Sequence, residues 1–121
     1  MLAVRVLIIG AGEVGFHLAR RLSEEEHDVV VIESDPERAE RVGEQLDVMV
    51  VEGNGASLPV LEEAGIRDTD LLLAVTSKDE VNLIACLAAS RLDVAFRAAR
   101  ISNPEYYEAD SVLSRDELGV D

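Results

Sequence analysis

The run Val4-Arg5-Val6-Leu7-Ile8-Ile9-Gly10-Ala11-Gly12-Glu13-Val14-Gly15 decides the fold of this chain. Its apolar, β-branched half predicts a buried strand over about 4–9, and its glycines predict a loop that opens a helix over about 14–22. Gly10 permits a tight turn, Gly12 allows a pyrophosphate to approach the backbone, and Gly15 allows the helix to pack closely on the sheet. The run is typical of a dinucleotide-binding unit, in which the phosphates rest on the helix N-terminus.

A carboxylate stands where such a unit needs one. Glu33 ends the next apolar run and follows Gly15 by 18 residues, close to the spacing of about 20 that the motif requires. A carboxylate there accepts hydrogen bonds from both ribose hydroxyls and repels a 2'-phosphate, and neither Ser34 nor Asp35 is an arginine that would neutralise one. The sequence therefore predicts that NAD(H), ATP or ADP binds better than NADP(H). A glycine turn without a ligand is the alternative.

Strands and helices alternate along the rest of the chain. Asp35 before Pro36 predicts a capped helix start. Strict alternation with short loops predicts an α/β fold, a Rossmann-like doubly wound parallel sheet in the order 3-2-1-4-5 with helices on both faces. The further strands are expected over about 29–32, 48–51, 71–75 and 95–101, and the further helices from 35, over about 57–65, over about 80–92 and from 103.

The strand at 71–75 is apolar throughout, which predicts burial on both faces. At the other end of the chain, Val120-Asp121 reads as the start of a truncated sixth strand. We therefore expect 1–121 to be a single NAD(H)- or adenine-nucleotide-binding domain, the N-terminal fragment of a longer protein.

Composition limits the function classes. The chain has 121 residues, 48% of them hydrophobic, and its 25 acidic against 11 basic residues give a net charge of −14. Such a charge disfavours binding to nucleic acid or to an anionic membrane, and a salt-adapted source is an alternative explanation for it. The single cysteine, Cys86, lies in an apolar run and is expected to be buried. No apolar run approaches a membrane span and no signal peptide is visible, so we expect a cytoplasmic protein.

The carboxyl ends of parallel strands meet at one edge of a sheet, and polar residues follow several of the predicted strands. Thr76 and Ser77 are candidates for ligand contact, with capping of the next helix as an equal alternative. Asn54-Gly55 is a second candidate, with a turn that needs positive φ as its alternative. Arg100 is a third, with a surface ion pair as its alternative. Lys78, the only lysine, also stands at this edge.

These segments together resemble one family, the N-terminal nucleotide-binding domain of Trk-type potassium-uptake regulatory proteins, also called the RCK or KTN domain. The resemblance covers essentially the whole chain, and its most specific part follows the fourth strand. It rests on Gly10-Ala11-Gly12-Glu13-Val14-Gly15, Glu33 followed by Asp35, Gly53-Asn54-Gly55, Thr76-Ser77-Lys78-Asp79-Glu80-Val81-Asn82, Ala99-Arg100 and Leu118-Gly119-Val120-Asp121.

The resemblance implies a regulatory subunit that binds NAD(H) or ATP/ADP and transmits the ligand state to a membrane potassium transporter. It implies a cytoplasmic protein held at the inner membrane through that partner, and assembly as dimers or larger rings. Asn54 departs from the family's usual aspartate. The implied cofactor-binding residues are Gly10, Gly12, Glu13, Val14 and Gly15 at the phosphates, Glu33 at the adenosine ribose with Ser34 beside it, Asn54 and Gly55 near the adenine, Thr76 and Ser77 near the distal phosphate or second ribose, and Arg100 at the phosphates or the partner subunit.

We assign no catalytic residue and no metal ligand. The alternative is the cofactor domain of an NAD-dependent dehydrogenase, but an acid or base beside a nicotinamide is missing: there is no Tyr-x-x-x-Lys pair, and both histidines lie within the first 30 residues. The helix at 80–92 is apolar nearly all round, although covering a sheet requires only a stripe. We therefore expect the chain to self-associate through that helix.

Overall fold

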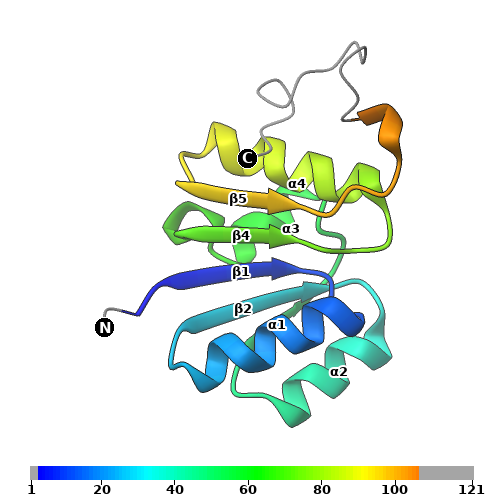
Figure 1. Cartoon of the computed structure of the whole chain (residues 1–121). Coiled ribbons are helices and arrows are strands. Elements are labelled where there is room, and N and C mark those ends of the chain that lie inside the picture. Colours follow the sequence, from blue (N-terminus) through cyan, green and yellow to red (C-terminus); the bar gives the residue numbers. More distant parts are fainter. Residues whose placement is uncertain (1–2, 107–121) are drawn as a thin grey trace.

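The computed structural model describes residues 3–106, which form a five-stranded parallel sheet in the order β3-β2-β1-β4-β5 (Figure 1). The predicted strand order is confirmed. The strands are β1 (Arg5–Ile9), β2 (Asp28–Glu33), β3 (Met49–Glu52), β4 (Leu71–Ala74) and β5 (Phe96–Ala99). The helices are α1 (Glu13–Glu24), α2 (Pro36–Gln45), α3 (Leu58–Glu63) and α4 (Asp79–Arg91), with 3-10 turns η1 (Ile66–Asp68) and η2 (Pro104–Tyr106).

Helices lie on both faces of the sheet, as predicted. In β1, Leu7 and Ile9 belong to a core that also contains buried residues of α3 and α4, among them Cys86. Val6 and Ile8 point to the opposite face, where they share a core with Phe16 of α1 and with Val42 of α2. Figure 1 shows α1 and α2 together on one side of the sheet and α3 and α4 on the other. Because every strand pair is parallel, all five carboxyl ends lie at the same edge of the sheet.

The structure confirms the predicted starts of two helices, α2 and α3. Asp35 caps α2 by accepting a hydrogen bond from the backbone N–H of Arg38 at 3.0 Å, and Pro36 occupies the first turn. Ser57 caps α3 in the same way, and Gly65 ends the segment in the left-handed region with φ +83°. Since α2 begins three residues after β2 ends, its first turn lies at the carboxyl edge of the sheet.

The prediction that the fourth strand is buried on both faces is wrong. Leu72 and Ala74 are buried, but Leu71 and Leu73, on the face that carries α1 and α2, are only half-buried. Phe96 of β5, the register partner of Leu71, is 67% exposed. Within residues 3–106 the helices on that side follow β1 and β2, so they leave the β4–β5 half of the face partly open.

The chain beyond β5 bears on two further predictions. The Asn103 side chain accepts a hydrogen bond from the backbone N–H of Glu105 at 3.0 Å and opens η2, so the predicted helix start is seen as a 3-10 turn. The rest of the predicted last helix and the predicted sixth strand lie outside the described residues. Among residues 3–106, no helix has the length and apolar character needed to cross a membrane.

Candidate functional site

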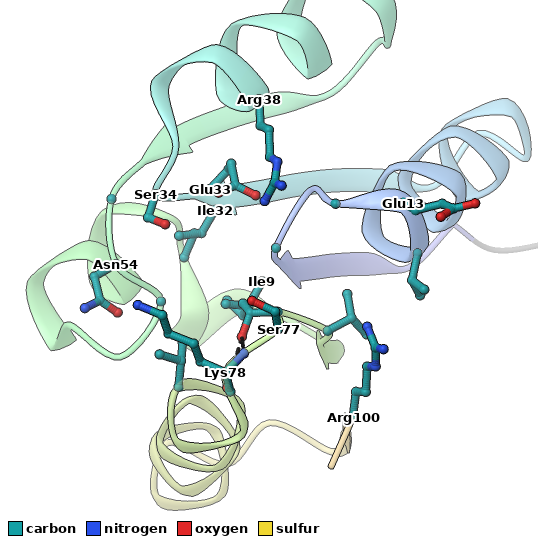
Figure 2. Close-up of a pocket in the computed structure, with 18 residues that line it drawn as sticks. Ile9, Glu13, Ile32, Glu33, Ser34, Arg38, Asn54, Ser77, Lys78 and Arg100 are labelled. Atoms are coloured by element: carbon teal, nitrogen blue, oxygen red, sulfur yellow. Dashed lines mark hydrogen bonds between the residues drawn. The ribbon is translucent and has the colours of Figure 1, made fainter. Parts of the chain in front are cut away.

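A cavity of about 440 Å³ opens at the carboxyl edge of the sheet, between the loops that follow all five strands (Figure 2). Eleven of the twelve predicted site residues line it: Gly10, Gly12, Glu13, Val14, Glu33, Ser34, Asn54, Gly55, Thr76, Ser77 and Arg100. The exception, Gly15, is buried beneath the glycine loop. The predicted site residues did not include the apolar lining, which is supplied by Ile9, Ile32, Val75 and Val81, or Gly53 and Arg38, which also face the cavity.

Glycine stands at the three positions of this loop for different structural reasons. Gly10 has φ +103°, a conformation that L side chains rarely adopt, and a Cβ on Gly15 would overlap the carbonyl oxygen of Gly10. Gly12, in contrast, has φ −71°, and a Cβ there would meet nothing within 4 Å. The fold therefore requires glycine at positions 10 and 15. It does not require glycine at position 12, where a Cβ would point into open space.

The first turn of α1 offers unpaired backbone donors beside Gly12. No side chain caps this helix, and its first intrahelical bond runs from the N–H of Phe16 to the carbonyl of Gly12 at 2.9 Å. Within residues 3–106 the N–H groups of Glu13, Val14 and Gly15 have no acceptor. Three orphan donors at the positive end of a helix dipole favour a negatively charged group at this side of the cavity.

Glu33 is 5% exposed and holds two loops of the site together. Its Oε1 accepts a hydrogen bond from the N–H of Ala11 at 2.7 Å, and its Oε2 accepts one from the N–H of Asp35 at 2.9 Å. A carboxylate has about four acceptor positions, so both oxygens can still accept ribose hydroxyls. The sequence indicated only this second role, because the first depends on β1 and β2 being neighbours.

The loop after β3 is not the positive-φ turn that was the alternative interpretation of Asn54-Gly55. Positive φ occurs at Gly10 and Gly65 among the described glycines, so Asn54-Gly55 is not such a turn. Gly55 is buried, and a Cβ there would overlap Cγ2 of Ile9. Asn54 shapes the loop by accepting the N–H of Ala56 on Oδ1 at 2.8 Å. Glycine is thus required at position 55 by close packing.

Thr76 is tied to a fully buried asparagine. The Oδ1 of Asn82 accepts hydrogen bonds from the N–H and the hydroxyl of Thr76, at 2.9 and 2.7 Å. The Nδ2 of Asn82 donates to the carbonyls of Thr76 and Arg100, at 3.0 and 2.8 Å. The N-cap of α4 is Lys78 and has no side-chain bond, so neither Thr76 nor Ser77 is the N-cap residue. The Thr76 hydroxyl accepts the backbone N–H of Lys78 at 3.2 Å, just before the helix begins.

The first turn of α4 also holds the chain that leaves β5. Asp79 is 9% exposed, and its carboxylate accepts the N–H groups of Ser102 and Asn103 at 2.9 and 2.7 Å. The hydroxyl of Tyr106 donates to Glu80 at 3.2 Å, and the negative charge of Glu80 raises the pKa of Tyr106 above its ordinary value. The loop after β4 and the segment 100–106 therefore form one hydrogen-bonded unit at the edge of the cavity.

Three cations line the cavity: Arg38, Lys78 and Arg100. None of them forms an ion pair with another residue in the range 3–106, although the chain carries 25 carboxylates. The surface-ion-pair alternative for Arg100 is therefore not seen in this part of the chain. The sequence held one signal for Arg38: it lies in the first turn of a helix that starts at Pro36, three residues after Glu33. No cluster of metal-ligating side chains exists in the part of the chain that the structure describes.

Comparison with known proteins gives one family. The model of the TrkA-N domain matches residues 6–121. A "Trk system potassium uptake protein TrkA homolog" of Archaeoglobus fulgidus is 46% identical over 118 residues, which are 98% of this chain and 26% of the relative. The chain thus spans about a quarter of the length of this relative.

Solved structures agree with the fold. The TrkA-N domain of the inner membrane protein ybaL from Escherichia coli superposes with a TM-score of 0.77 at 22% identity, covering 99% of this chain and 85% of that one. The GsuK channel bound to NAD superposes with a TM-score of 0.64 at 26% identity, covering 75% of this chain and 16% of that one. GsuK has also been solved bound to ADP, with a TM-score of 0.63 and 24% of that chain covered.

Proposed function

This chain belongs to the TrkA-N domain family, and we propose that it binds NAD(H) or ATP/ADP and passes the ligand state to a membrane potassium transporter. The observation that carries the proposal is Gly12. It borders three orphan N–H groups and an open cavity, and the fold would accommodate a Cβ at this position without a clash. Room for a pyrophosphate explains the glycine.

The residues of the cavity support a specific set of contacts. The phosphates would lie against Gly10, Gly12 and the N–H groups of Glu13, Val14 and Gly15, and the ribose would bind Glu33 with Ser34 beside it. The adenine would lie near Asn54 and Gly55, against the apolar side chains of Ile32 and Val81. Thr76, Ser77 and Arg100 would contact the distal phosphate or the second ribose.

The transport role rests on the relatives. The Archaeoglobus protein is named for Trk potassium uptake, and GsuK is a channel with NAD and ADP complexes. By analogy, this domain would sit on the cytoplasmic side of the inner membrane, attached through its transporter. The hydrogen bonds of Asp79 and Asn82 join the nucleotide edge to segment 100–106, which gives a route by which the ligand state reaches the following chain.

The first prediction separates a regulator from a dehydrogenase cofactor domain. We expect the full-length protein that contains this domain to return NADH, NAD+ and ATP chemically unchanged after prolonged incubation, because this sequence has no Tyr-x-x-x-Lys pair and neither histidine lines the cavity within residues 3–106. In membrane vesicles that also hold its transporter, added nucleotide should change the rate of potassium uptake. Steady oxidation of NADH by a small 2-oxo acid, or steady reduction of NAD+ by a small 2-hydroxy acid, would favour the dehydrogenase instead.

A second prediction concerns assembly. On α4 the outward residue Ile84 is 46% exposed, and Leu87 one turn away is half-buried, so part of the apolar surface expected from the sequence is open within residues 3–106. We propose that this surface mediates dimerisation. Light scattering of the chain at high protein concentration should give a dimer mass, and Ile84→Glu should shift it toward the monomer. A strictly monomeric wild-type chain in both low and high salt would refute the proposal.

A further inference from the structure

Arg38 occupies a position that the proposed contacts do not use. Its backbone N–H bonds to the Asp35 carboxylate at 3.0 Å, which fixes it on the first turn of α2. Its side chain extends over the cavity beside Glu33, with Ser34 on the same rim (Figure 2). The guanidinium has no ion-pair partner among residues 3–106. A cation without a partner in so acidic a chain is available to a ligand.

The same end of the cavity holds the carboxylate that would bind the ribose. Glu33 already accepts two backbone N–H groups, which stabilise its charge and occupy part of its acceptor capacity. A ribose seated on Glu33 would present its 2' position toward the side of the cavity over which Arg38 extends. Arginine binds phosphate through a planar fork of donors, and a nearby arginine is how dinucleotide-binding units accommodate a 2'-phosphate.

We propose that Arg38 is a ligand for a phosphate on the 2' position of the adenosine ribose, so that the cavity accepts 2'-phosphorylated adenine nucleotides, NADP(H) included. This inference rests on the proposed function, since it requires an adenosine seated on Glu33. It revises the expectation that a 2'-phosphate is repelled. That expectation considered only Ser34 and Asp35, whereas the neutralising charge stands one helical turn further along the chain.

The local charge agrees with this assignment. Three cations line the cavity against two carboxylates, Glu13 and Glu33, although the chain as a whole carries a charge of −14. Exposed charges farther away than about 10 Å are largely screened at ordinary salt, so a bound phosphate responds mainly to these near groups.

Two small nucleotides test the proposal on the intact chain. Calorimetric titration would compare 5'-AMP with adenosine 2',5'-bisphosphate, which differ only at the 2' position. We expect the wild type to bind the bisphosphate at least as tightly as 5'-AMP. Arg38→Gln should weaken the binding of the bisphosphate about tenfold and the binding of 5'-AMP less than about twofold, as expected for losing a charge-assisted contact to one phosphate.

Arg41→Gln is the matched control. It removes the same charge from the same helix, but Arg41 lies over the ring of Phe16 and does not line the cavity. It should leave both affinities unchanged.

Three results would overturn the inference in distinguishable ways. Equal weakening of both nucleotides by Arg38→Gln would place the guanidinium on the base or on the 5'-phosphate. Much weaker binding of the bisphosphate by the wild type, unaffected by Arg38→Gln, would refute the 2' assignment and leave the proposed function standing. A folded wild-type chain that binds neither nucleotide would refute both.

Discussion

Replacing Gly12 with aspartate should weaken the binding of NADH or ADP by at least a hundredfold and leave the fold intact. The Cβ enters open space at φ −71°, so nothing in the protein has to move. The carboxylate, however, would stand where a pyrophosphate approaches the N–H groups of Glu13 and Val14. Two like charges about 4 Å apart repel by about 4 kcal/mol at an effective dielectric of 20, or roughly a thousandfold in affinity. Calorimetric titration and a thermal melt measure the two effects.

Gly43→Asp is the control for this variant. Gly43 is an exposed residue of α2 outside the cavity, and a Cβ there would make only an ordinary contact at 3.7 Å with Val50. The added charge is the same, so any loss that this control shares with Gly12→Asp is due to net charge and not to the site. Unchanged affinity in a folded Gly12→Asp variant would refute the placement of the phosphates.

The second large effect is on stability, at Asn82. The change Asn82→Asp keeps the shape of the side chain but replaces the Nδ2 donor with an oxygen that faces the carbonyls of Thr76 and Arg100. An uncompensated charge at a fully buried position should cost about 3–5 kcal/mol, a large part of the stability of a domain of this size. Denaturant unfolding measures it. Protonation of the introduced carboxyl removes the charge and restores a donor, so the deficit should shrink as the pH falls.

Asn54→Asp provides the comparison. Asn54 is exposed, and its side chain only accepts the N–H of Ala56, which a carboxylate does equally well. We expect a change within about 0.5 kcal/mol, as for ordinary surface substitutions. If Asn82→Asp proved as harmless as Asn54→Asp, the buried hydrogen bonds of Asn82 would not be what holds the loop after β4 to the end of β5.

The sequence predicted those parts of the fold that depend on local signals. The turn at Gly10, the cap formed by Asp35 with Pro36, and the end of α3 at Gly65 each follow from the conformational preference of one or two residues. Strict alternation of strands and helices then predicted the strand order, because crossovers in parallel sheets are right-handed. The strand order in turn predicted which loops would meet at the cavity.

What the sequence did not predict depends on contacts between distant segments. The hydrogen bond from Ala11 to Glu33, the packing of Gly55 on Ile9, and the link from Asn82 to Arg100 each join two strands or loops. Arg38 was missed for a related reason: the sequence shows that it follows Asp35, but only the folded helix shows that its side chain reaches the cavity. Half-burial of Leu73 likewise reflects which helices cover which part of the sheet.

In our proposal, an adenine nucleotide binds to this chain at the first turn of α1. Backbone amide NMR spectra of the labelled chain, recorded during titration with NADH and with ADP, test it most directly. We predict saturable shifts of the Glu13, Val14 and Gly15 amides, which have no acceptor within residues 3–106, while the Gly43 amide stays in place. If other amides showed saturable shifts while these three stayed in place, or if no amide shifted at millimolar nucleotide, nucleotide binding at this turn would be refuted.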